Sequence, residues 1–211
     1  MIDKFLRIFT WAVRGCFVLM IIYSAAVGNI KPMTDATTGF FLTFVPIFFR
    51  AVVRLVIPVR LEAFFILFVF LANFLGSCIG FYDLFKWWDI LLHASSGAFL
   101  AIISLSFIDS AIEGRSIRDW NPWVLSLLVF TFAISCGTLW EFYEYAMDVF
   151  FDYGMQKHTL LPDGTIDTGI IDTMTDELCA AASALVYTVS VLVCAKTGKY
   201  RYMEQFLIKR K

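Results

Sequence analysis

Charged residues are scarce in this chain. Asp, Glu, Lys and Arg make up 17% of its 211 residues, against about 25% in soluble globular proteins. Hydrophobic residues reach 60%, including 23 phenylalanines, and the mean hydropathy is +0.76. A water-soluble domain of this size would expose too much of that apolar surface. The composition therefore excludes a soluble enzyme and a disordered chain, and it predicts an integral membrane protein.

The sequence also lacks the patterns of several familiar sites. The net charge of -1 gives no basic patch for a polyanion, so no nucleic-acid partner is expected. There is no HExxH, no Gly-rich phosphate loop, and no GxSxG with a histidine to serve it. The acid-rich stretch 162–172 lacks EF-hand spacing and is predicted to form turns and loop. The cysteines stand singly in apolar runs, so they are expected to be packing residues without disulfides; they are Cys16, Cys78, Cys136, Cys179 and Cys194.

Six apolar stretches predict an all-α, polytopic transmembrane helix bundle. At about 20 residues each, they leave no room for a soluble domain, so residues 1–211 are predicted to be one integral-membrane domain. The expected spans are about 11–30, 39–57, 61–80, 89–108, 123–149 and 176–195. The first span resembles a signal peptide, with Ser24-Ala25-Ala26 as a candidate cleavage site. We expect it to remain uncleaved, because further spans follow at once.

Basic residues predict that both termini are cytoplasmic. With six spans, thirteen Lys and Arg fall in cytoplasmic segments and only Lys31, Lys86 and Lys157 fall outside, as the positive-inside rule requires. Arg14, one turn inside the first span, is expected to reach back to the cytoplasmic interface. The thirteen are Lys4, Arg7, Arg50, Arg54, Arg60, Arg115, Arg118, Lys196, Lys199, Arg201, Lys209, Arg210 and Lys211. Without the second span, which Pro46 interrupts, the basic C-terminus would lie outside.

Acidic residues gather on the opposite side. Twelve of the eighteen fall at the predicted extracytoplasmic face, and three groups of polar residues stand at helix ends. Within each group the spacing of three, four or seven residues puts the side chains on one helix face. The groups are Asp89 with His93 starting the fourth span, Glu141, Glu144 and Asp148 ending the fifth, and Asp172 with Asp176 starting the sixth. Because these ends share one membrane depth, we expect the groups to meet in one pocket.

Helix capping is the alternative role for the acids at helix starts. Asp89, Asp172 and Asp176 would satisfy free N–H groups there, and Thr173 with Asp176 fits a capping box. Capping does not explain the three acids of the fifth span, because they stand at a helix C-terminus, which disfavours negative charge, and because like charges on one face repel. Such a group near hydrocarbon needs a cation, shared protons or water.

The two histidines have different expected roles. His93 lies among acids, so it is a candidate ligand or proton-transfer group. An interhelical hydrogen bond is the alternative role for a histidine in a span. His158, in a loop without a patterned partner, is expected to be solvated. Small residues suited to close helix packing run from Ala180 to Ala184.

At these residues the sequence resembles the YjdF-like family of bacterial inner-membrane proteins, over the region from Leu61 to Cys194. The motifs that carry the resemblance are Trp88–His93 with Gly97, Trp140–Tyr145 and Asp172–Asp176. The order DxxxH, ExxE, DxxxD is distantly similar to the VanZ-like family, where Glu144 and Asp176 of this chain would be Gln and Asn. The resemblance implies a multi-pass protein of the bacterial inner membrane, and neither family supplies a known reaction.

Three functional hypotheses remain open. The first is a membrane enzyme that depends on Mg²⁺, Mn²⁺, Ca²⁺ or Zn²⁺ and acts on a lipid-linked or small-molecule substrate, with Glu141, Glu144 and His93 as catalytic candidates. The second is a transporter in which the same acids bind a cation or relay protons. The third is a structural or interaction protein whose only assured partner is the lipid bilayer. The candidate metal ligands are Asp89, His93, Glu141, Glu144, Asp172 and Asp176.

The topology can be tested directly. Because of the thirteen-to-three charge bias, reporter fusions after residue 211 should be active only as cytoplasmic reporters, and fusions within 150–175 only as extracytoplasmic ones. A C-terminal fusion that reports only from outside would contradict this orientation.

Overall fold

The computed structural model describes residues 2–111, 116–157, 159–167 and 169–210. In this part of the chain six helices are long and apolar enough to cross a membrane, which confirms the all-α fold with six spans. They cover Lys4–Val27, Ile30–Val52, Val59–Cys78, Trp88–Ala111, Pro122–Phe151 and Ile170–Thr197. The orientation of the termini stays a prediction. Arg115, His158 and Lys211 lie outside the described residues, so the solvated role expected of His158 also stays a prediction.

The chain divides into two compact units, one formed by Met1–Trp88 with Gln205–Lys211 and the other by Asp89–Glu204. We call them unit 1 and unit 2. The single membrane domain expected from the sequence stays a prediction.

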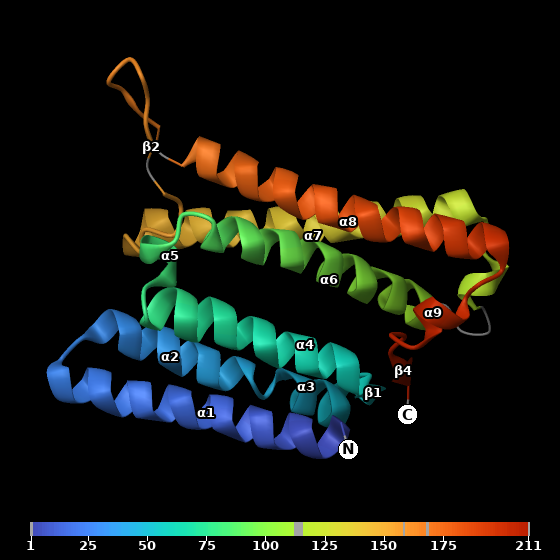
Figure 1. Ribbon diagram of the computed structural model, residues 1–211, viewed down its shortest axis with the longest axis horizontal. Coiled ribbons are helices and arrows are strands. Elements are labelled where there is room, and N and C mark those ends of the chain that lie inside the picture. Colours follow the sequence, from blue (N-terminus) through green and yellow to red (C-terminus); the bar gives the residue numbers. More distant parts are fainter. Residues whose placement is uncertain (1, 112–115, 158, 168, 211) are drawn as a thin grey trace. The chain divides into compact units, whose positions relative to one another are not determined.

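Three long helical segments build unit 1, and they run side by side in Figure 1. Helices α1 and α2 pack along one another, and α2 packs along η2. Two-residue strands β1 and β4 pair antiparallel. The elements are α1 (Ile2–Val27), α2 (Ile30–Leu42), α3 (Val45–Phe48), the π-helix η1 (Phe49–Val53), β1 (Leu55–Val56), α4 (Val59–Val69), the π-helix η2 (Phe70–Cys78), α5 (Phe81–Leu84) and β4 (Lys209–Arg210).

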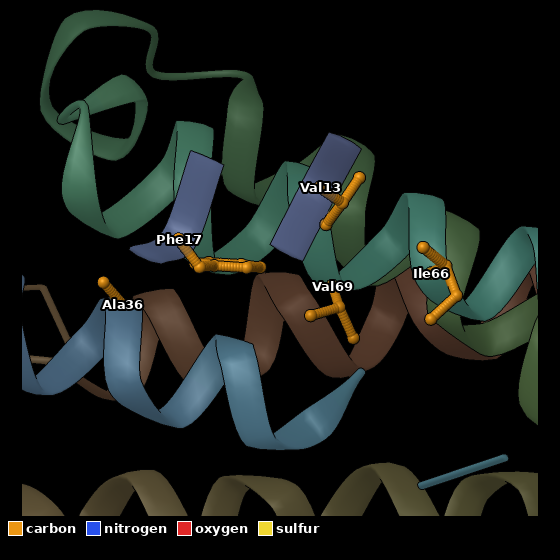
Figure 2. Close-up of a cluster of buried hydrophobic side chains, with 5 residues drawn as sticks. All are labelled: Val13, Phe17, Ala36, Ile66 and Val69. Carbon is orange, nitrogen blue, oxygen red and sulfur yellow. The ribbon is translucent and has the colours of Figure 1, made fainter. Parts of the chain in front are cut away.

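Apolar side chains from three helices form the core of unit 1 (Figure 2). Phe17 of α1 is fully buried and packs edge-on against Phe74, with ring centroids 5.7 Å apart. Its ring lies against Gly39 of α2, where a Cβ would come within 2.4 Å of it. Glycine therefore lets the two helices approach each other closely. The five core residues are Val13, Phe17, Ala36, Ile66 and Val69.

The second span is broken near its middle, and Arg14 contacts the break. Helix α2 ends before Pro46, whose ring nitrogen has no hydrogen to donate to a preceding carbonyl. Arg14 donates from Nε to Thr43 Oγ1 at 2.9 Å and from Nη2 to the Thr43 carbonyl at 3.0 Å. Its guanidinium also lies over the Phe44 ring. Arg14 is buried, and the break supplies it with acceptors that a regular helix lacks. Its expected reach to the cytoplasmic interface stays a prediction.

Three spans begin earlier than hydropathy indicates. The first starts at Lys4 instead of about residue 11, the second at Ile30 instead of about residue 39, and the sixth at Ile170 instead of about residue 176. Polar residues in their first turns lower the local hydropathy without interrupting the backbone hydrogen bonds of the helix. As a result, Asp176 lies inside the sixth helix, while Asp172 lies in its first turn.

Unit 2 is a bundle of three long helices. Helix α7 packs along α8, and its start is capped by Asn121, which accepts from the backbone of Trp123 and Val124. The start of α6, the end of α7 and the start of α8 lie at the same end of the unit (Figure 1). The elements are α6 (Trp88–Ala111), the 3-10 helix η3 (Ile117–Asp119), α7 (Pro122–Phe151), the antiparallel strands β2 (Thr159–Leu160) and β3 (Ile166–Asp167), α8 (Ile170–Thr197) and α9 (Arg201–Glu204).

Candidate functional site

The centre of the candidate site is a group of three residues from α6 and α8, called here the triad: Asp89, His93 and Asp176. His93 Nε2 lies 3.6 Å from Asp89 Oδ1 and 3.8 Å from Asp176 Oδ2. One ligand atom from each residue lies within 4.8 Å of the other two, so the triad could hold a metal ion. Carboxylate oxygens and imidazole nitrogens bind divalent cations at about 2.0–2.6 Å, so atoms this close can surround a single ion.

Glu141 of α7 faces the same histidine from the other side. Its Oε1 lies 3.9 Å from His93 Nδ1. Only 5% of Glu141 is exposed, and its Oε2 is buried without a hydrogen-bond partner. A buried carboxylate oxygen without a partner is unfavourable, so this atom is available to a ligand.

Two further predicted residues lie beside this centre and have partners of their own. Glu144 is 8% exposed and accepts a 2.7 Å hydrogen bond from Nε1 of Trp140. It also interacts electrostatically with Glu141 and Asp89. Asp172 accepts a 3.0 Å hydrogen bond from the backbone N–H of Lys157. The structure thus gathers Asp89, His93, Glu141 and Asp176 around one point, with the other two acids at its edge.

The negative end of the α7 dipole acts on Asp148, and not on Glu141 and Glu144 as expected. Helix α7 continues to Phe151, so Glu141 and Glu144 lie about two turns or more before its end, while the dipole acts mainly within the last turn. Asp148 alone lies in that last turn, and it accepts from the backbone N–H groups of Met155 and Gln156 at 2.6 and 2.8 Å. Asp148 therefore anchors the following loop and does not join the site. Burial, more than the dipole, disfavours the negative charge of the two glutamates.

The capping box expected at Thr173 and Asp176 does not form. Helix α8 begins at Ile170 after Gly169, and Asp167 accepts from the backbone N–H of Ile171 at 3.0 Å. Asp167 thus satisfies the free N–H at this helix start in place of Asp176. Asp176 lies within the helix and faces His93.

Close packing of α6 against α8 positions the triad. A Cβ on Gly97 would lie 2.1 Å from the carbonyl oxygen of Ala180 and 2.5 Å from Ser183 Oγ. Gly97 is one turn after His93, and Ala180 is one turn after Asp176, so this contact holds the two ligands opposite each other. The run of small residues from Ala180 to Ala184 thus packs as expected.

Sequence reasoning missed two charged groups beside the site. Lys157 Nζ lies 2.5 Å from Asp89 Oδ2, although the sequence indicated only a loop lysine. Burial would lower the pKa of Lys157, but its hydrogen bond to Asp89 and the charges of Asp89 and Asp172 outweigh burial and raise it. Glu177 of α8 interacts electrostatically with His93 and Glu141, and its Oε1 is buried without a partner. No motif marked either residue; only its place beside Asp176 could have indicated Glu177.

Comparison with known proteins gives a family without an assigned reaction. Residues 8–197 match the family described as "Predicted membrane protein (DUF2238)", so the chain belongs to that family. It is similar to an "Uncharacterized protein" of Thermotoga maritima, with 26% identity over 175 residues, 78% of this chain and 80% of the relative. No solved structure matches the chain.

Replacing Gly97 tests the packing that positions the triad. Gly97→Ala should destabilise the protein in detergent by about 1–3 kcal/mol, because the new methyl group meets a backbone carbonyl that cannot move alone. Denaturant titration followed by tryptophan fluorescence measures the loss. Gly15→Ala is the control, since nothing lies within 4 Å of a Cβ there; equal stability of the two variants would refute the tight contact.

Proposed function

We propose that this family member binds one divalent cation through Asp89, His93 and Asp176 and uses it in a metal-dependent reaction on a membrane substrate. The observation that carries the proposal is the convergence of three ligand atoms within 4.8 Å of one another. The partnerless Oε2 of Glu141, from a third helix, supports it. Glu141 would be the fourth protein ligand or would hold a water bound to the ion.

The ligand chemistry favours a hard or borderline cation. Carboxylate oxygens with one imidazole suit Mn²⁺ or Zn²⁺, while Mg²⁺ and Ca²⁺ prefer oxygen ligands alone. Among the described residues near the triad, the carboxylates outnumber Lys157, the one cation in contact with them. A divalent cation would offset this excess of negative charge.

Catalysis is the use that best fits the remaining acids. A bound cation polarises an oxygen of its substrate or lowers the pKa of bound water. Glu144, close to the triad and held by Trp140, would then serve as the general base. A lipid-linked or phosphate substrate would approach at the helix ends, which the charge bias of the sequence assigns to the extracytoplasmic side of a bacterial inner membrane. The YjdF-like and VanZ-like resemblances agree with a site at these motifs and name no substrate.

Ion transport has less support than catalysis. In the described part of unit 2, the buried charged residues Glu141, Glu144 and Asp176 all lie at the end of the unit that holds the triad, and the remaining buried polar residues carry only hydroxyls. One of these, Ser104, is already bonded to the carbonyl of Leu100. A path for ions or protons through the unit would need further titratable groups along it.

Metal binding should stabilise the purified protein. A cation that binds only the folded state adds RT ln(1 + [L]/Kd), about 2.7 kcal/mol at a hundredfold excess over Kd. The protein in detergent should therefore melt at a higher temperature with Mn²⁺ or Zn²⁺ than with EDTA, as measured by differential scanning fluorimetry. Asp176→Asn should remove most of this difference.

Two further variants make that experiment specific. Asp83→Asn removes an exposed acid of α5 and should leave the metal-induced shift unchanged. Glu141→Gln should raise the melting temperature of the metal-free protein, because a buried negative charge is removed, and should reduce the shift. If chelation changes nothing and Glu141→Gln destabilises the protein with or without metal, the acids are hydrogen-bonded structure and the proposal fails.

The catalytic part has its own test. Wild-type protein in vesicles of bacterial lipid extract should change the lipid profile, read by mass spectrometry, only when Mn²⁺ or Zn²⁺ is present. Glu144→Gln should lose at least 99% of that activity, since a general base contributes about 10²–10⁴-fold, yet keep the metal-induced thermal shift. A variant with wild-type turnover would exclude Glu144 as the base.

A further inference from the structure

An ammonium group of the protein already contacts one member of the triad. Lys157 Nζ lies 2.5 Å from Oδ2 of Asp89, and Oδ1 of the same carboxylate lies 3.6 Å from His93 Nε2. A cation bound to the triad would therefore share the Asp89 carboxylate with Lys157.

The backbone that carries Lys157 is fixed to both neighbouring helices. We call residues 155–157 the strap. Asp148 at the end of α7 holds the N–H groups of Met155 and Gln156, and Asp172 of α8 holds the N–H of Lys157. Gln156 also donates from Nε2 to Thr173 Oγ1 at 2.8 Å.

Gly169 allows the strap to lie close to the start of α8. A Cβ on Gly169 would come within 2.9 Å of Gln156 Cβ, and its φ of +109° suits glycine. The backbone of the strap is therefore held in place, and the long side chain of Lys157, which is 37% exposed, reaches from it to Asp89.

We propose that Lys157 is a built-in competitor of the divalent cation: its ammonium pairs with Asp89 when the triad holds no metal, and a divalent cation displaces it. This inference rests on the proposed metal site and adds its regulation. Two positive charges that share one carboxylate repel strongly in a partly buried site. The metal-bound site and the Lys157–Asp89 pair are therefore mutually exclusive states.

Competition by a tethered ammonium also gives selectivity for charge. The strap keeps the lysine at a high effective concentration next to Asp89, so a monovalent cation offers the carboxylate nothing that Lys157 does not already supply. A divalent ion also binds the imidazole of His93 and the carboxylate of Asp176. Only this additional binding free energy offsets the loss of the Lys157–Asp89 ion pair. Because Lys157 competes for Asp89, the triad binds divalent cations but not Na⁺ or K⁺.

A supporting role for Lys157 predicts the opposite effect. If the ammonium served to orient Asp89 toward the metal, its removal would weaken metal binding. Competition instead predicts that its removal strengthens binding, so one affinity measurement separates the two roles.

The test is Mn²⁺ binding to full-length protein in detergent, measured by isothermal titration calorimetry. Lys157→Met keeps the length of the side chain and removes its charge, so the Kd for Mn²⁺ should fall at least tenfold. Lys86→Met, which removes an exposed lysine of another loop, should leave the Kd unchanged, and Lys157→Arg should retain weak binding. An unchanged or increased Kd in Lys157→Met would overturn the competition.

Amine labelling of the wild-type protein provides a second readout that needs no variant. Mn²⁺ should speed acetylation of Lys157 by an amine-reactive reagent several-fold, since the displaced ammonium becomes free, while labelling of Lys86 stays constant; peptide mass spectrometry gives both rates. If Mn²⁺ binds by calorimetry but leaves the labelling of Lys157 unchanged, the competition is wrong and the metal site stands. If no divalent ion binds either wild-type or Lys157→Met, the proposed function itself fails.

Discussion

The contact between Gly97 and the carbonyl of Ala180 is the constraint on which the candidate site depends. Helix α6 contributes Asp89 and His93, and α8 contributes Asp176, so their spacing is set by how closely the two helix backbones approach. Within a membrane, apolar side chains gain little by leaving lipid for protein, and helix association relies on close van der Waals packing between small residues. A single methyl group at Gly97 would separate the elements that hold the ligands.

Six of the acids at this end of unit 2 divide into two kinds according to what they contact. Asp148, Asp167 and Asp172 accept backbone N–H groups and thereby fix the strap and the start of α8. Asp89 and Asp176 instead surround His93, together with Glu141. The first kind holds the backbone in place, which leaves the second kind positioned but rich in negative charge. That excess is what a cation, whether Lys157 or a metal ion, would balance.

The buried charge of Arg14 in unit 1 has a different role from the acids of unit 2. There the buried guanidinium of Arg14 satisfies backbone and hydroxyl acceptors at Thr43, where the second span is broken. The π-helical segments η1 and η2 also lie in this unit, and such segments interrupt the regular pattern of backbone hydrogen bonds. Arg14 thus stabilises a break in a span of unit 1, whereas the buried acids of unit 2, Glu141, Glu144 and Asp176, lie at one end.

Composition and hydropathy alone determined the all-α fold and its six spans, because a span needs only about 20 consecutive apolar residues. Helical spacing also determined that Asp89 shares a face with His93, since i, i+4 is a property of any α-helix. The start of α8 was misjudged because a helix can continue through polar residues that lower hydropathy, and this error produced the capping box that does not form. Only the tertiary structure decided that Asp148 anchors a loop while Glu141 lies beside His93, and that Lys157 reaches Asp89 across 68 residues of sequence. Such contacts depend on the rotation and separation of whole helices, which no local pattern specifies.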